Sequence, residues 1–242
     1  MDLRPSARKV DEMRKISIVE GFASSSPSSV IIAYGKTKVL CSASIENRVP
    51  SFLKGSGSGW VTAEYGMLPS ATATRNRREA VSGNQSGRTV EIQRLIGRAL
   101  RSVVSLEELS EITIVVDCDV LSADGGTRTA SITGGYVALS RAVEHLLESN
   151  RILKNPIYGM VAAVSVGIYN GVPIIDLDYS EDSAAETDMN IVMNDMAHYV
   201  EIQGTAEGHA FSTSELATML ELANNGIKEL LEIQRKYISP QK

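Results

Sequence analysis

Three groups of residues in this sequence have the types and spacings suited to chemistry on an anionic molecule. The first lies between Arg75 and Arg101, where seven arginines and only two glutamates give a net charge of +5. Four of these arginines lie in a segment rich in glycine, serine, asparagine and glutamine; they are Arg75, Arg77, Arg78 and Arg88. Forked guanidinium groups make paired contacts with phosphate, and flexible segments of this kind become ordered on polyanions. The window therefore predicts a local polyanion site.

The other three arginines of this window lie on a predicted helix from about Thr89 to Val104. Apolar residues recur there at the 3.6-residue period and form one face, while Arg94, Arg98 and Arg101 gather on the opposite side. Runs of charge usually face water. For these three arginines we therefore favour a solvated face or a contact between subunits over a role in binding.

The second group is the segment from Ser122 to Ser131, which follows a strand-like run and precedes a long helical pattern. Gly125 and Gly126 allow a ligand to approach the backbone, and Thr127, Arg128 and the amides at the helix start offer donors and positive charge to an anion. The spacing is not that of a Walker motif. A strand, two glycines and a helix are also what any tight connection looks like, so both interpretations stay open here.

The third group is acidic. Six carboxylates fall within thirteen residues: Asp176, Asp178, Glu181, Asp182, Glu186 and Asp188. Carboxylates at this density repel one another unless a cation or an arginine neutralises them, although plain surface acidity is the alternative. Asp188 opens the apolar run Met-Asn-Ile-Val-Met, and a charge tied to a buried strand is costly without a purpose.

The elements that position these groups follow a repeated pattern. Residues 28–46 and 160–179 each contain two β-like runs around a turn, at Gly35-Lys36 and at Asn170-Gly171. Each half then supplies a further strand and a long helix: residues 111–120 and 129–149 in the first half, 199–208 and 212–237 in the second. The pattern predicts an α/β protein of two layers, with duplicated ββ…βα halves at residues 10–145 and 157–238.

Composition sets the class of protein. The chain has 242 residues, 43% hydrophobic and 22% charged, with a formal net charge of −5, so a polyanion site must be a local basic patch. No stretch approaches the roughly 20 apolar residues that span a bilayer, and the N-terminus lacks the apolar core of a secretion signal. We expect a cytoplasmic protein that makes no membrane contact, with Cys41 and Cys118 as buried, reduced thiols.

Six segments, taken in order, resemble the bacterial ribonuclease PH family over nearly the whole chain. They are GWVTAEYGMLPSATATRNRREA (59–80), GRTVEIQRLIGRALR (87–101), DCDVLSADGGTRTASITGGYVAL (117–139), NPIYGMVAAVSVGI (155–168), EDSAAETDMNIVM (181–193) and EIQGTAEG (201–208). One departure lies near the N-terminus, where the Asp-Gly of the family's Arg-x-Asp-Gly-Arg stretch is replaced by Ser6-Ala7. A second is Arg77, an additional charge beside two arginines that match the family pattern.

The resemblance implies a role for each of the three groups. Arg88, Gly126, Thr127 and Arg128 match positions that hold inorganic phosphate. Asp182 and Asp188 match catalytic carboxylates associated with Mg²⁺, and Arg75 and Arg78 match arginines that grip RNA, a grip that Arg77 would strengthen. The family also implies a ring, a homohexamer built as a trimer of dimers.

The activity implied by the resemblance is phosphorolysis. Inorganic phosphate would remove 3′-terminal nucleotides from RNA, with tRNA precursors and also ribosomal RNA as substrates, releasing nucleoside diphosphates; the reverse addition of nucleotides would also run. Two alternatives stay open, namely an inactive RNA-binding ring subunit and a metal-dependent hydrolytic nuclease. Retention of both aspartates and of the Gly-Gly-Thr-Arg segment argues against the inactive subunit.

Overall fold

The computed structural model describes residues 4–21, 28–207 and 210–238, and its first half is built on a five-stranded sheet. The strands have the order β1-β2-β3-β5-β4, and their bounds are β1 (Ile16–Glu20), β2 (Val30–Tyr34), β3 (Thr37–Glu46), β4 (Trp60–Met67) and β5 (Thr113–Ser122). All neighbours are antiparallel except β4 and β5, which run parallel. Helix α2 lies between β4 and β5 in the chain, as a parallel connection requires.

A four-stranded antiparallel sheet forms the second half. It has the order β7-β6-β8-β9, with β6 (Val161–Tyr169), β7 (Val172–Ile175), β8 (Thr187–Asn194) and β9 (Tyr199–Ala206). The hairpin between β6 and β7 turns at Asn170 and Gly171, which both have positive φ, 50° and 73°. This is the backbone geometry that an Asn-Gly pair favours in a two-residue turn.

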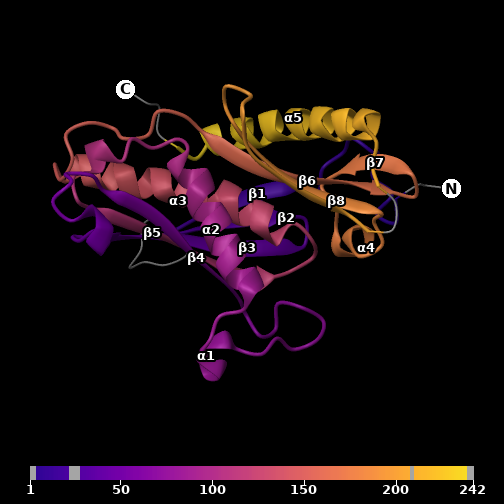
Figure 1. The fold of residues 1–242 in the computed structure, drawn as a ribbon, viewed down its shortest axis with the longest axis horizontal. Helices are drawn as coiled ribbons and strands as arrows, with labels where there is room; N and C mark the ends of the chain where they lie inside the picture. Colours follow the sequence, from indigo (N-terminus) through magenta and orange to yellow (C-terminus); the bar gives the residue numbers. More distant parts are fainter. Residues whose placement is uncertain (1–3, 22–27, 208–209, 239–242) are drawn as a thin grey trace.

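The helices hold the two sheets together (Figure 1). Their bounds are α1 (Glu79–Ser82), α2 (Gly87–Arg101), α3 (Thr127–Glu148), α4 (Tyr179–Asp182) and α5 (Thr213–Arg235), with short 3₁₀ turns at Ser51–Leu53 and Glu107–Leu109. Helix α3 packs on β2, β3 and β5 of the first sheet and on β6 of the second, while α5 packs on β6 and β7. Helix α1 stands off the body on a long loop, at the bottom of Figure 1.

Close packing beneath α3 fixes the position of its N-terminus. Gly134 passes so near the first sheet that a Cβ there would lie 2.6 Å from Ile32 Cγ2 and 2.9 Å from Cys41 Sγ. Cys41 and Cys118 face each other across β3 and β5, and both thiols are free and buried. Because a larger residue at position 134 would push the helix outward, this glycine holds α3 and the loop before it against β3.

The predicted fold class is confirmed: the protein is a mixed α/β fold with two sheets. Both hairpins and all three long helices form where the sequence places them. The boundaries differ by a few residues at several elements, and two of these differences have a clear local cause. Helix α2 begins at Gly87, since Ser86 caps it by accepting a hydrogen bond from the Thr89 amide, and it ends at Arg101 rather than Val104. Strand β7 ends at Ile175, because Asp176 adopts a positive φ of 53° that breaks the extended backbone.

The sequence-based predictions do not include β1, α1 and α4, all of five residues or fewer, or the two 3₁₀ turns. Short elements give too few residues for a period to be recognised. None of the helices in the described part of the chain combines the length and the apolar content needed to cross a bilayer.

Candidate active site

The start of α3 lies where the two halves of the protein meet. Gly125 and Gly126 have φ of 75° and 67°, a backbone conformation that glycine adopts most readily. A Cβ at Gly125 would lie 2.5 Å from the carbonyl oxygen of Leu177, and one at Gly126 would lie 3.0 Å from Nη2 of Arg14. The first amides of the helix have no partner within it and carry positive charge. The predicted anion-binding loop is thus packed directly against the segment that leads to α4.

The hydroxyl of Thr127 is fixed by a tyrosine from the first sheet. Tyr65 on β4 is buried, and its hydroxyl lies 2.8 Å from the hydroxyl oxygen of Thr127. Burial raises the pKa of Tyr65, while the hydrogen bond with Thr127 and the positive charges of Arg88 and Arg128 act to lower it. Three of the residues predicted to hold phosphate therefore act on Tyr65: Thr127 through a hydrogen bond, and Arg88 and Arg128 through their charge.

Arg128 is held by residues from both halves. Its Nη1 donates to Oε1 of Gln203 on β9 at 2.8 Å and lies 3.6 Å from Oε1 of Glu91 on α2. The amide of Gln203 in turn donates to Glu91 at 2.6 Å. Burial lowers the pKa of Arg128, and the positive charge of Arg88 lowers it further. Arg128 is partly buried, and the like charge of Arg88, which is exposed, makes an anion near Arg128 favourable.

The two predicted catalytic carboxylates come from α4 and from β8. Asp182 is the last residue of α4, a one-turn helix that Asp178 caps by accepting from the amides of Ser180 and Glu181. Asp188 is the second residue of β8, and its Oδ1 accepts a hydrogen bond from Thr205 on β9 at 2.9 Å. The acidic pair therefore belongs entirely to the second half.

These carboxylates share an electrostatic environment with the arginines. Asp182 is exposed to solvent, but the surrounding protein removes part of its hydration. This desolvation raises the pKa of Asp182, and the negative charge of Asp188 raises it further. The positive charges of Arg128 and Arg88 act in the opposite direction. Arg128 and Asp188 also contact neighbouring positions of β9, Gln203 and Thr205, so the basic and acidic groups lie near one another.

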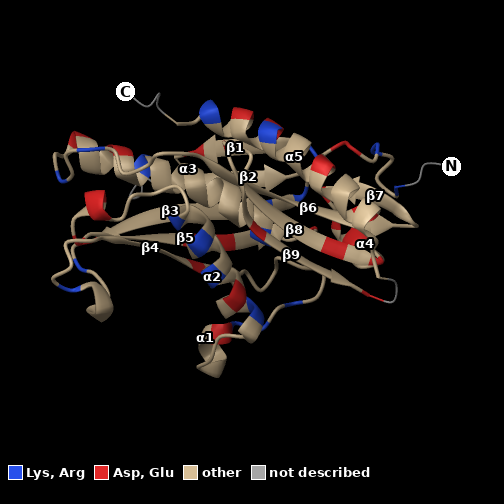
Figure 2. Ribbon diagram, turned by 45° about the horizontal axis from the view of Figure 1, so that its top comes forward, with Lys and Arg blue, Asp and Glu red and all other residues tan. Residues whose placement is uncertain are grey.

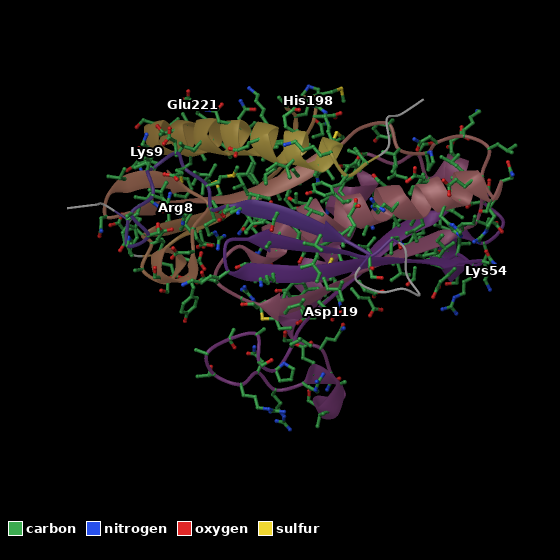
Figure 3. All side chains as sticks on the ribbon, turned by 180° about the vertical axis from the view of Figure 1, so that it is seen from behind. Arg8, Lys9, Lys54, Asp119, His198 and Glu221 are labelled. Atoms are coloured by element: carbon green, nitrogen blue, oxygen red, sulfur yellow. The ribbon has the colours of Figure 1, made fainter. Side chains whose placement is uncertain are left out.

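Arginines of the N-terminal segment neutralise three other carboxylates of the acidic cluster, namely Asp176, Asp178 and Glu181. Arg4 is buried and makes two hydrogen bonds of 2.8 Å with Glu181, one to each carboxylate oxygen. Arg8, labelled in Figure 3 on the N-terminal segment, also binds Glu181, at 2.9 Å, and lies 3.6 Å from Asp178. The replaced Ser6-Ala7 pair does not disturb this packing, because Ser6 itself donates to Glu181 at 3.1 Å.

The predicted RNA-gripping arginines lie on the loop around α1 (Figure 2). Arg77 and Arg78 line a cavity of about 580 Å³ together with Arg88 and Tyr65, between this loop and the end of β4. Arg75 is exposed on the same loop and does not line the cavity. The structure therefore places Arg77 and Arg78 in one cavity with Arg88, which is predicted to hold phosphate, and leaves Arg75 exposed on the same loop.

The three arginines along α2 have separate surroundings. Arg94 is exposed, and Arg98 pairs with Glu201 on β9. The guanidinium of Arg101 lies 4.3 Å from the ring centroid of Trp60 and donates to the carbonyl of Val61 at 2.8 Å. These contacts join α2 to β4 and β9, and they keep Arg98 and Arg101 engaged within the chain rather than with the cavity.

A divalent cation fits the donor set of Asp182 and Asp188. Within residues 4–21, 28–207 and 210–238, no cluster of three or more histidine, cysteine or acidic residues could hold a metal. Mg²⁺ keeps several water ligands and commonly binds one or two carboxylates together with substrate phosphate oxygens. Two neighbouring carboxylates beside an anion site are the donors that such a cation needs.

Three residues of the site escaped the sequence analysis as individual candidates, namely Tyr65, Glu91 and Gln203. All three lie in segments already singled out by the resemblance, at 59–80, 87–101 and 201–208. Tyr65 and Gln203 carry no charge at neutral pH, and Glu91 reads as one surface acid in a basic window. Their contacts with Thr127 and Arg128 arise only from the folded arrangement.

Comparison with known protein families gives two matches along the chain. Residues 12–143 match the 3′ exoribonuclease family, domain 1, and residues 159–226 match the 3′ exoribonuclease family, domain 2. Together these matches cover most of the chain, including the arginine window, the start of α3 and both aspartates.

Solved structures with the same fold include three from exosomes and related proteins. An exosome of Archaeoglobus fulgidus with RNA bound to the active site is similar over 95% of this chain and 91% of its own, at 20% identity and a TM-score of 0.80. An archaeal exosome core matches over 97% and 90%, at 18% identity and a TM-score of 0.72. Rrp46 of rice (Oryza sativa) matches over 98% and 100%, at 16% identity and a TM-score of 0.74.

Proposed function

Since the chain belongs to the 3′ exoribonuclease family, we propose that it is a phosphorolytic enzyme that shortens RNA from the 3′ end. The observation that supports this proposal is that Arg128 and Asp188 bind Gln203 and Thr205, two positions apart on β9, with Thr127 beside Arg128 at the start of α3. The charges of Arg88 and Arg128 also act on Asp182. The arginines and the start of α3 suit a free phosphate ion. The carboxylates suit a cation that would neutralise the scissile phosphodiester.

In the proposed reaction, an oxygen of inorganic phosphate attacks the phosphorus of the terminal phosphodiester. The bond from that phosphorus to the 3′-oxygen of the preceding nucleotide breaks, and this oxygen takes up a proton. The products are a nucleoside diphosphate and RNA shortened by one nucleotide. Because a diphosphate linkage replaces a diester, the reverse addition of nucleotides also runs.

The chain's own residues supply positioning and charge. Two anions must meet, and the barrier to phosphoryl transfer is lowered chiefly by alignment and by neutralisation of charge. Arg88, Arg128, Thr127 and the amides after Gly126 hold the attacking phosphate, and Arg75, Arg77 and Arg78 hold the RNA backbone. Asp182 and Asp188 would hold Mg²⁺, and such a cation would supply positive charge to stabilise the scissile phosphate and the leaving oxygen.

We further propose that the protein is a ribonuclease PH of the bacterial kind that acts on tRNA precursors, with ribosomal RNA as a second substrate class, in the cytoplasm. Both the phosphate-binding groups and the carboxylates lie within one chain, so identical subunits suffice for activity. The resemblance implies a homohexamer built as a trimer of dimers, in which each chain has its two halves at residues 10–145 and 157–238. The mass of this hexamer in solution would be six times the 26.1 kDa of the chain.

One experiment separates this function from its alternatives. RNA with a labelled 5′ end and radioactive nucleotides is incubated with the protein and Mg²⁺, with and without inorganic phosphate. Phosphorolysis yields nucleoside diphosphates only when phosphate is present. Nucleoside monophosphates in both reactions would identify a hydrolytic nuclease, and RNA that is bound but never shortened would identify an inactive subunit. Either of these results overturns the proposal.

A further inference from the structure

Arg14 lies between the anion-binding loop of the first half and the acidic segment of the second. Its Nη1 donates to the carbonyl oxygen of Asp124. Nη1 and Nη2 also donate to the carbonyl oxygen of Gly125, at 3.4 and 3.5 Å respectively. On its other side, Nε and Nη2 make a bidentate pair with the carboxylate of Asp176, at 2.9 and 2.6 Å. One guanidinium thus joins two loops that lie 51 positions apart in the chain, between Gly125 and Asp176.

Asp176 is a rigid anchor for this contact. It is buried, and its backbone has a φ of 53°, which is strained for a residue other than glycine. One carboxylate oxygen also accepts from the backbone amide of Arg14 at 2.7 Å, and its own amide donates to the carbonyl of Ser165 at 2.7 Å. The segment that starts here continues through Leu177 to the cap of α4 at Asp178, so the position of Asp176 sets where α4 begins.

The side chain of Arg14 is committed to these contacts and is 7% exposed. Burial disfavours its charge, but the hydrogen bond with Asp176 and the charge of Asp176 outweigh this, and the pKa of Arg14 is raised. A lysine would keep the charge but has a single nitrogen, which cannot make the paired contact with Asp176 and reach the loop at the same time. The function of the residue therefore depends on its forked shape.

We propose that Arg14 is a positioning residue that sets the distance between the phosphate-binding start of α3 and the carboxylate of Asp182. Its guanidinium contacts Asp124, Gly125 and Asp176, so in this role it acts through the protein and not directly on RNA or the attacking phosphate. This inference rests on the proposed phosphorolytic function and extends it to a residue outside the three groups that carry out the chemistry. Small displacements of reacting groups are costly, and a shift of about 1 Å lowers the rate by roughly a hundredfold.

Arg4 is a matched control, because it belongs to the same buried network. It is 1% exposed, pairs with Glu181, and donates to the carbonyl of Asp176 at 3.2 Å. It makes no hydrogen bond with residues 124–126, which Arg14 does contact. Loss of Arg4 therefore removes a buried ion pair from the same region without releasing the loop that precedes α3.

The test compares Arg14→Lys with Arg4→Lys in the full chain. KM for inorganic phosphate and kcat are measured by release of nucleoside diphosphate, the dissociation constant for phosphate by calorimetry, and stability by thermal unfolding. We expect Arg14→Lys to raise KM and the dissociation constant for phosphate by roughly ten- to a hundredfold. Arg4→Lys should lower the unfolding temperature but leave both constants within about threefold of wild type.

Equal phosphate constants for wild type and Arg14→Lys would overturn the role of Arg14, and so would an equal rise in both variants. If Arg14→Lys does not fold, Asp176→Asn replaces it, since the amide keeps the shape and removes the charge that orients Arg14. Unchanged phosphate constants in that variant would also overturn the inference. A wild-type protein that releases no nucleoside diphosphate would instead refute the proposed function, whatever the variants do.

Discussion

Arg128, at the start of α3, donates a hydrogen bond from Nη1 to Oε1 of Gln203 on β9 over 2.8 Å. The two residues belong to different halves of the protein, and Glu91 on α2 contacts both of them. An arginine held on two sides has its guanidinium oriented before any anion arrives. Preorganised donors of this kind bind and stabilise negative charge more effectively than mobile ones.

We expect Gln203→Leu to raise KM for inorganic phosphate by about tenfold, because a hydrogen bond to a charged group contributes roughly 1.5–3 kcal/mol and Arg128 would lose one of its two partners. The matched control is Glu201→Gln, two positions earlier on the same strand, whose partner is Arg98. Initial rates at varied phosphate concentration measure the effect. An unaltered KM in the leucine variant would remove Gln203 from the phosphate site.

Asp182→Asn should lower kcat for phosphorolysis by about a hundredfold or more, in line with the loss of one charge-stabilising group. Arg88→Ala should reduce kcat/KM for phosphate to a similar extent. Glu186→Gln lies in the same acidic segment, where the carboxylate accepts from the amide of Gly171, and serves as the control. Near-normal turnover by purified Asp182→Asn would contradict its assigned role.

Much of the candidate site could be predicted from the sequence, because runs of charged residues can be recognised without knowing the fold. The arginine window and the two glycines before Thr127 each indicate an anion site, and the acidic run near Asp182 indicates a partner of opposite sign. The residues that connect the basic and acidic groups could not be predicted from the sequence. Arg14 reads as an ordinary basic residue near the N-terminus, and Gln203 as a polar residue of a strand, since their partners lie far away in the sequence.

The long elements of the fold could also be predicted from the sequence, whereas the short ones could not. Long amphipathic helices and alternating strands show a hydrophobic period over many residues, whereas β1, α1 and α4 are too short to show one. The early end of β7 comes from the backbone conformation of Asp176, which three buried contacts with Arg14 impose. Local propensity carries no information about such a tertiary constraint.

The double variant Arg75→Ala/Arg78→Ala should weaken RNA binding and reduce its dependence on salt. Each arginine that contacts a phosphate of single-stranded RNA releases a counterion, so the slope of log K against log salt should fall by about 1.4. Fluorescence anisotropy at several salt concentrations measures it. Lys228→Ala/Lys236→Ala removes the same charge from two exposed positions, one on α5 and one directly after it, and its slope should match wild type. A slope unchanged in the arginine variant would exclude the loop from the RNA path.

Ala7→Gly should stabilise the protein by up to about 1 kcal/mol. Ala7 has a φ of 57°, a backbone conformation that destabilises the folded state for alanine but not for glycine. The greater entropy of glycine in the unfolded chain offsets part of this gain. Ala80→Gly, on α1, has no such strain to relieve and should not raise the midpoint of denaturation. Chemical denaturation at fixed protein concentration compares the two. A midpoint lowered by Ala7→Gly would contradict strain at this position.

Asp117→Asn should stabilise the protein at pH 7.5 and much less at pH 4. Burial, with the negative charges of Glu64 and Asp119, raises the pKa of Asp117 to about 6. Since the folded state holds this proton more tightly than the unfolded state, stability falls as the pH rises from about 4 through 6. The asparagine variant avoids that loss.

Thermal unfolding at the two pH values measures the difference between Asp117→Asn and wild type. Asp11→Asn, at an exposed position of the N-terminal segment, controls for the change in net charge. An Asp117→Asn variant whose advantage is the same at pH 4 and at pH 7.5 would show that the negative charge of Asp117 is not destabilising in the folded protein.

The division of the site between two halves of one chain bears on its biosynthesis. During translation the arginine loop and the start of α3 leave the ribosome first, while α4 and β8 are still to be made. Under the proposed function, a chain still lacking α4 and β8 carries arginines suited to RNA but neither aspartate of the acidic pair. The proposed site is complete only once Asp176 has paired with Arg14 across the two halves.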